Sequence, residues 1–166
     1  MTQTGLARGP EEAGMAKKSM AEAQLMLGNQ LCFAIYSTAH AFNRVYKPLL
    51  DRLGLTYPQY LVMLVLWEED GIAVKEIGER LFLDSGTLTP LLKRLDAAHL
   101  IRRTRSTRDE RQVLIALTAQ GHALREKARA VPAAILSASG CSIGELSSLR
   151  KSLVALRDQL NAAVGK

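Results

Sequence analysis

The chain has 166 residues, of which 48% are hydrophobic and 23% charged, so we expect one globular domain, or one domain with appendages. Its 22 Lys and Arg residues outnumber 16 Asp and Glu residues, and the net charge of +6 favours a polyanionic partner. Two cysteines exclude a disulfide scaffold or a zinc cluster. The longest apolar run, Tyr60–Trp67, is too short to span a bilayer, and the N-terminus lacks a secretory signal, so we expect a soluble cytoplasmic protein.

The first third of the chain is expected to hold a tail and two helices. Residues 1–23 are small, polar and interrupted by glycine and proline, which is typical of a mobile tail. From about Gln24 to Leu53 apolar residues recur at helical spacing, and Pro48 could kink or break this helix. Thr56–Gln59 has the spacing of a capping box and predicts a second helix through about Glu69.

Two shorter helices follow. The pattern over 74–83 predicts an amphipathic helix, and the leucines over 87–99 predict another. Pro90 allows two starts for the later helix: it is the first helical residue after a Thr89 cap, or it lies in the first turns of a helix capped at Asp84. We favour the start at Asp84, with a slight distortion at the proline.

The last part of the chain predicts a hairpin and two more helices. Residues 101–105 and 112–117 are expected to be strands joined by a polar, exposed connection. Thr118 caps a helix over 119–131 that Pro132 interrupts. A final capping box precedes a long apolar stripe at helical spacing, formed by Ile143, Leu146, Leu149, Leu153, Leu156 and Leu160.

This order of elements predicts a mainly α-helical winged helix-turn-helix with a small β-hairpin wing. The winged unit has its own core, so pairing with a second chain is the economical use of the apolar stripes at both ends. We therefore expect a homodimer held by the N- and C-terminal helices. The expected segments are a tail over 1–23, a dimerisation and sensor segment over 24–53, a DNA-binding domain over 54–118 and a second dimerisation segment over 119–166.

Basic charge gathers on the predicted reading helix and wing. From Lys93 to Arg111 seven basic residues stand against three acidic ones. The second helix of a helix-turn-helix lies in the major groove, and small hydroxyl residues at its start can reach bases or phosphates. A merely solvated basic hairpin is the alternative. We expect a partner of double-stranded, pseudo-palindromic operator DNA, contacted by Ser85, Thr87, Thr89, Lys93, Arg94, Arg103, Arg108, Asp109 and Arg111.

Cys32 lies in the first predicted helix, with Tyr36 one turn later on the same face. Hydrogen-bond donors, cations or a helix N-terminus can make a cysteine reactive by stabilising its thiolate, and tyrosine hydroxyls are such donors. If Asn29 caps the helix, Cys32 lies in its first turn; if the helix begins near Ser19, the helix dipole gives no help. The alternative is an inert, small core residue.

Five stretches resemble the MarR family of regulators, and more narrowly its OhrR subgroup of organic-hydroperoxide-sensing repressors. The resemblance covers roughly residues 25–160. Its most specific parts are the sequences around Cys32 and at the start of the reading helix, whereas the wing motif is general to the family. The matching stretches are Asn29–Tyr36, Tyr46–Asp51, Leu55–Leu61, Leu83–Leu95 and Asp109–Val113.

The resemblance implies a repressor that binds its operator when reduced and is released when an organic hydroperoxide oxidises Cys32 to a sulfenic acid. It also implies that Tyr46 and Tyr57 donate hydrogen bonds to the thiolate, with Tyr57 coming from the partner subunit or the adjacent helix. Tyr36 would line the same pocket. Oxidation would then bias the dimer towards a geometry in which the two reading helices no longer match one operator.

The role of Cys141 is left open by the resemblance. Some members of the subgroup resolve the sulfenic acid with a second cysteine of the other subunit, located after the wing, and Cys141 lies in such a stretch. Other members have only the sensor and use a small-molecule thiol, which would make Cys141 a plain loop cysteine.

Enzyme functions are not expected. Gly140–Gly144 matches the spacing of a serine-hydrolase nucleophile motif, but all three histidines precede Ser142, which is better explained as a helix cap. A thiol peroxidase using Cys32 and a MarR-type repressor that binds a phenolic ligand remain the alternatives. We expect no cofactor, and no residues have the spacing of metal ligands.

Overall fold

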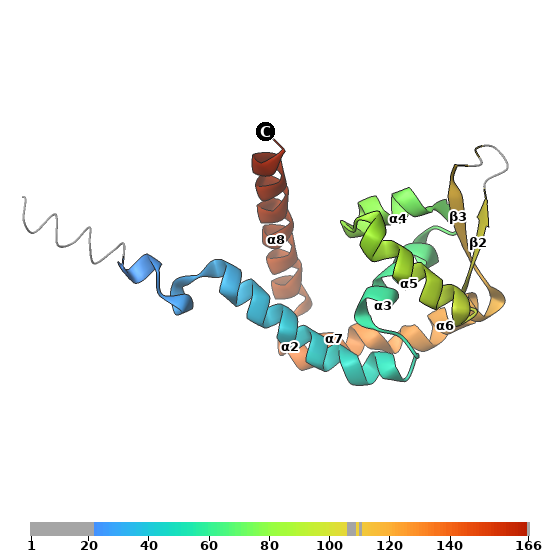
Figure 1. The fold of residues 1–166 in the computed structure, drawn as a ribbon. Helices are drawn as coiled ribbons and strands as arrows, with labels where there is room; N and C mark the ends of the chain where they lie inside the picture. The colour runs from blue at the N-terminus through green and yellow to red at the C-terminus, as the bar shows by residue number, and fades with distance from the viewer. Residues whose placement is uncertain (1–21, 106–108, 110, 166) are drawn as a thin grey trace, which may run out of the picture. The chain divides into compact units, whose positions relative to one another are not determined.

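The computed structural model describes residues 22–105, 109 and 111–165 (Figure 1). The tail predicted for residues 1–23 lies almost wholly outside these residues, as does Arg108 at the tip of the predicted wing. The chain divides into two compact units between Arg44 and Val45, and each unit is described by itself.

The described part of the first unit contains a 3₁₀ turn, Leu27–Asn29, and most of α2, Leu31–Asp51. The predicted start of this helix at Gln24 is wrong, because Gln30 adopts an extended backbone conformation and only its carbonyl, which accepts from Ala34 N at 3.1 Å, begins the helix. Asn29 is not the cap either: its side-chain amide donates to Ala23 O at 2.7 Å.

Pro48 lies inside α2 without ending it. A proline within a helix removes one backbone hydrogen bond, and burial of neighbouring side chains can offset that loss. Here Leu50 is fully buried and Leu49 packs against the same core. The C-terminal turns of α2 are therefore held by the second unit, to which they belong.

The second unit is the predicted winged helix-turn-helix followed by three further helices among its described residues. Its three strands form one antiparallel sheet in the order β1-β3-β2, with Ile101 opposite Leu117 across the hairpin. Strand β1 was not predicted, since two residues are too few to show a periodic pattern. The elements are α3 (Tyr57–Glu68), β1 (Ile72–Ala73), α4 (Val74–Leu81), α5 (Ser85–Ala97), β2 (Ile101–Arg105), β3 (Val113–Leu117), α6 (Ala119–Ala128), α7 (Ala130–Ser139) and α8 (Ile143–Val164).

Side-chain caps begin four of these helices where the sequence predicted them. Thr56 and Ser142 form complete capping boxes before α3 and α8, and Thr118 caps α6. Asp84 accepts the backbone N–H of Thr87 at 2.9 Å, so α5 has the favoured start and Pro90 lies inside it. These caps satisfy N–H groups that have no partner within their helices.

The predicted break at Pro132 is wrong in position. Helix α6 ends at Ala128, Arg129 joins it to α7, and Pro132 is the third residue of α7. The first-turn N–H groups of a helix have no intrahelical partner, so proline is tolerated there. The interruption therefore precedes the proline by three residues.

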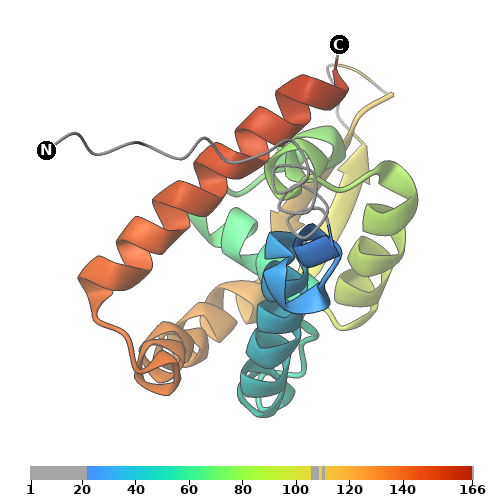
Figure 2. The same ribbon diagram turned by 90° about the vertical axis from the view of Figure 1, so that its left-hand side faces the viewer.

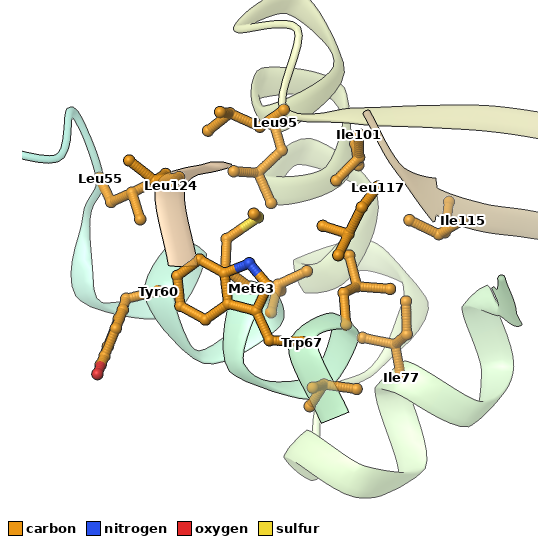
Figure 3. Close-up of a cluster of buried hydrophobic side chains, with 14 of the residues drawn as sticks. Leu55, Tyr60, Met63, Trp67, Ile77, Leu95, Ile101, Ile115, Leu117 and Leu124 are labelled. Atoms are coloured by element: carbon orange, nitrogen blue, oxygen red, sulfur yellow. The ribbon is translucent and has the colours of Figure 1, made fainter. Parts of the chain in front are cut away.

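The core of the second unit is closed by α3, α4, α5, the sheet and α6 (Figure 3). Met63, Ile77, Leu95 and Ile115 are completely buried there, and the Trp67 indole N–H donates to Gly121 O at 2.9 Å. Trp67 is thus a core residue, as predicted. The described chain contains no helix long and apolar enough to cross a membrane.

Helix α8 contributes no buried residue to this core, although its apolar stripe is long. It leaves the end of α7 as one extended helix (Figures 1 and 2). Exposed large hydrophobic residues also mark α2, among them Leu31 and Phe33. In a single chain both stripes therefore face solvent, on α8 through Ile143, Leu149, Leu153, Leu160 and Val164.

Candidate functional site

Cys32 is the second residue of α2 and is exposed. The structure therefore has the arrangement in which the cysteine lies in the first helical turn, although Asn29 is not its cap. At that position the N–H groups of the first turn have no partner within the helix, and the positive end of the helix dipole lies nearby. Tyr36 follows one turn later and packs edge-on against His40, with ring centroids 4.4 Å apart.

Three tyrosines gather in the second unit. The rings of Tyr46 and Tyr57 lie 4.7 Å apart, and Tyr60 lies 6.0 Å from Tyr46. Burial, together with the neighbouring Tyr57 and Tyr60, raises the pKa of Tyr46 to about 12. Burial also raises the pKa values of Tyr57 and Tyr60. These phenols therefore remain neutral hydroxyls at physiological pH, which is the form that donates a hydrogen bond.

Tyr60 was not among the predicted site residues. It lies three residues after Tyr57 on α3, and this spacing puts both rings on one face of the helix. That signal was present in the sequence. Fourteen residues of α2, about four helical turns, separate Cys32 from Tyr46. The predicted redox residues thus fall into two groups, Cys32 with Tyr36 and Tyr46 with Tyr57.

Cys141 lies in the loop between α7 and α8 and is exposed. Gly140 before it has a left-handed backbone with φ of 65°, and Ser142 after it caps α8. Its backbone N–H donates to Ser139 Oγ at 3.2 Å. Both cysteines are free thiols and both are open to solvent. A hydrolase nucleophile of this motif follows a strand, whereas Ser142 follows a helix. Ser142 also caps α8 through its contacts with Glu145.

Helix α5 has one buried apolar face and one exposed polar face. Leu88, Leu92 and Leu95 point into the core, whereas Ser85, Lys93 and Arg94 are exposed. The Thr87 hydroxyl donates to Asp84 Oδ2 at 2.9 Å, and these bonds from Thr87 lower the pKa of the Asp84 carboxyl. Thr87 therefore stabilises the start of the reading helix, whatever else it contacts.

A groove lies between this helix-turn-helix and the wing. Arg103 of β2 is half-buried, and its Nε is enclosed without a hydrogen-bond partner among the described residues. Lys75 was not a predicted site residue; it lies at the start of α4, where the first helix of this motif passes the DNA backbone. The groove is lined by Ala73, Val74, Lys75, Glu76, Glu79, Thr89, Arg103, Arg111, Gln112 and Val113.

Asp109 shapes the base of the wing. Its carboxylate accepts the backbone N–H of Arg111 at 3.0 Å and the side-chain amide of Gln112 at 3.2 Å. These bonds link Asp109 to the two residues before β3, of which Arg111 lines the groove. No group of His, Cys, Asp or Glu within the described ranges is placed to hold a metal ion.

A helix-turn-helix whose reading helix is followed by a basic two-stranded wing defines a winged-helix DNA-binding regulator. Residues 44–128 match the family described as transcriptional regulator SarA/Rot. The chain is 55% identical over 139 residues to the HTH-type transcriptional regulator TtmR of Methylorubrum extorquens, covering 84% of this chain and 71% of that one. It is 50% identical over 137 residues to the organic hydroperoxide resistance transcriptional regulator of Bacillus subtilis, covering 82% and 93%.

Among solved structures, reduced AbfR bound to DNA has 36% identity and a TM-score of 0.70, covering 87% of this chain and 99% of that one. Overoxidised AbfR, also bound to DNA, has 37% identity and a TM-score of 0.68, covering 84% and 98%. Disulfide-formed AbfR has 38% identity and a TM-score of 0.59, covering 90% and 99%. The chain therefore belongs to the SarA/Rot and MarR-type family of transcriptional regulators, within the group of organic hydroperoxide resistance regulators.

Proposed function

We propose that the protein is a homodimeric repressor that binds operator DNA when reduced and leaves it when an organic hydroperoxide oxidises Cys32. The observation that carries the proposal is the exposed Cys32 in the first turn of α2, in a chain half identical to a hydroperoxide resistance regulator. A repressor must reach its operator on the chromosome, so we expect the protein to act in the cytoplasm.

The oxidation step needs a thiolate and a proton donor. The Cys32 thiolate attacks one peroxide oxygen, the O–O bond breaks, and the other oxygen leaves as an alcohol after taking up a proton, so that Cys32 becomes a sulfenic acid. Neutral phenols can stabilise the thiolate beforehand. Tyr46 lies about four turns along α2 from Cys32 of its own chain. Tyr46 and Tyr57 of the partner subunit would therefore stabilise the thiolate, with Tyr36 of the same chain lining the pocket.

We assign Cys141 of the partner subunit to the next step. Its thiol would attack the sulfur of oxidised Cys32, release water and leave an intersubunit disulfide. Its exposure in the short loop after Gly140 supports this role. The forms of AbfR also support it, because overoxidised AbfR was still bound to DNA and a disulfide form exists. The disulfide that follows the sulfenic acid would then reorient the two reading helices.

The proposed DNA surface combines the start of α5 with the wing. Ser85, Thr89, Lys93 and Arg94 of α5, with Arg103 and Arg111 of the wing, would contact bases and phosphates. Thr87 and Asp109 would act by stabilising the helix start and the wing turn. Cys32 would be oxidised once per release event, so the protein would be a sensor rather than an enzyme.

Operator binding with and without cumene hydroperoxide tests the proposal in the wild type, Cys32→Ser and Cys141→Ser. We expect release of the wild type only, with Cys32→Ser remaining bound, and a dimer band on a non-reducing gel that Cys141→Ser lacks. Hydroperoxide should be consumed stoichiometrically. Release of Cys32→Ser would overturn the sensor, catalytic peroxide consumption would indicate a peroxidase, and a band surviving Cys141→Ser would overturn the resolving role.

A groove between α3 and the α6–α7 junction favours one second candidate, a repressor that binds a phenolic acid. Apolar Leu64 and Trp67 line it together with Tyr60. Arg125 could hold a carboxylate, although Glu68 lines the same groove. Arg129 also lines it but pairs with Glu126 at 3.1 Å. Salicylate titrated against the operator complex tests this candidate. Release that is unchanged in Cys32→Ser would support it, whereas no release at millimolar salicylate would exclude it.

A further inference from the structure

The turn between α4 and α5 contains an unusual residue. Phe82 follows α4 with φ of 56° and ψ of 39°, the left-handed conformation that glycine or asparagine usually supplies at this position. The turn is tight, because Leu83 N donates to Gly78 O at 2.9 Å. A bulky side chain in this conformation is strained, and such strain is kept only when other contacts stabilise it.

Packing inside the winged domain does not explain the phenylalanine. The Phe82 side chain is 62% exposed, so the core of the domain gains little from it. The contact comes instead from α8, where the guanidinium carbon of Arg157 lies 4.4 Å from the centre of the Phe82 ring. This is within the range of an attractive cation–π interaction.

The geometry on α8 holds the arginine in place. Arg157 Nε and Nη2 donate to Asp158 Oδ1 at 2.9 and 2.7 Å, which orients the guanidinium plane. Asn161, one turn later, lines the same groove as Phe82, together with apolar Leu83 and Leu88. The flank of α8 that carries Arg157 therefore faces the α4–α5 turn, while the stripe through Leu149, Leu153 and Leu160 remains exposed.

We propose that the Phe82–Arg157 pair is a positioning contact that ties the DNA-reading head to α8, the helix whose stripe pairs with a second chain. The inference rests on the proposed function, in which one dimer presents two reading heads to one operator. A dimer reads two half-sites at a fixed spacing, so a head free to swing binds the operator less tightly. Phe82 and Arg157 then act through α5 without touching DNA.

A double-mutant cycle on the reduced full chain tests the pair. Phe82→Leu and Arg157→Gln should each weaken operator binding about threefold to fivefold, as expected for an exposed cation–π contact. The double variant should be no weaker than either single one. The conservative single variants Phe82→Tyr and Arg157→Lys should keep most of the wild-type operator affinity. Arg150→Gln, which removes the same charge two turns earlier on α8, should leave affinity unchanged.

Phe82→Gly separates positioning from stability. Glycine relieves the left-handed strain, so the melting temperature should stay the same or rise while operator affinity falls. If Phe82 had a purely structural role, the melting temperature and the operator affinity would change in the same direction. Independent effects in the double-mutant cycle, or unchanged operator affinity in Phe82→Leu, would overturn the inference.

A readout without DNA keeps this inference distinct from the proposed function. In protein labelled with 4-fluorophenylalanine, the ¹⁹F signal that disappears in Phe82→Leu should shift in Arg157→Gln and not in Arg150→Gln. An unshifted signal overturns the contact even if hydroperoxide releases the wild type from its operator. A shifted signal supports the contact even if the wild type ignores hydroperoxide, a result that would overturn only the proposed function.

Discussion

The winged domain and the two long terminal helices differ in how much of their apolar surface is buried within one chain. The winged domain closes a core of its own, in which Met63, Ile77 and Leu95 are fully buried. In contrast, α8 buries no residue, and the N-terminal half of α2 exposes Leu31 and Phe33. The difference indicates that the first region folds by itself, whereas the second is completed by another chain. The candidate sensor, Cys32, belongs to the second region.

The largest expected effect lies in the winged domain, at Gly121. A Cβ added there would collide with the backbone carbonyl oxygen of Leu100, and backbone on both sides would have to move. We expect Gly121→Ala to lower the free energy of unfolding by about 3 kcal/mol or more, measured by urea denaturation. Gly144→Ala on α8 is the control, since its nearest neighbour would be 4.0 Å away. A small loss in Gly121→Ala, equal to that of the control, would contradict the comparison.

A pair of leucines tests the comparison more directly. Leu92 is 1% exposed in the winged core and Leu153 is 40% exposed on α8. Leu92→Ala should cost about 2 to 5 kcal/mol of unfolding free energy. Leu153→Ala should raise the dimer dissociation constant about tenfold in sedimentation equilibrium, since it removes contact area between chains. An unchanged dimer in Leu153→Ala would show that the exposed stripe does not pair chains.

The smallest expected effect concerns the half-buried Tyr46. The pKa of Tyr46 is raised to about 12, so the folded state holds its proton more tightly than the unfolded state does. The resulting stabilisation is complete below about pH 10, the unfolded value, and is lost as pH rises through the folded value. Melting temperatures from pH 9 to 12 should fall less steeply in Tyr46→Phe. Parallel curves would contradict this account.

Local signals predicted most of the winged domain. Capping residues such as Thr56, Asp84 and Ser142 act on N–H groups two or three residues away, so their effect is visible in sequence. The hairpin was predicted with the bounds of β2 and within one residue of β3. Strand β1 was missed because it exists only through its pairing with β3, in which Ile72 lies opposite Ile115.

The sequence predicted which residues belong to the candidate redox site but not the backbone conformation that positions Cys32. Cys32 and three of the tyrosines were named, but the start of α2 at Leu31 depends on the extended Gln30 and on side-chain bonds from Asn29 and Gln30 to earlier carbonyls. The break before α7 also occurs at Arg129 rather than at Pro132. Apolar spacing carries no information about either conformation.

The sequence by itself determined the winged helix-turn-helix, its caps and the two free apolar stripes, because periodicity and capping are properties of neighbouring residues. Only the tertiary structure decided that Tyr60 joins Tyr46 and Tyr57, and that Phe82 meets Arg157 across 75 positions of the chain. Those contacts depend on how separate helices pack. The spacing of apolar and polar residues along any one helix is the same whether or not the contacts form, so the sequence alone does not predict them.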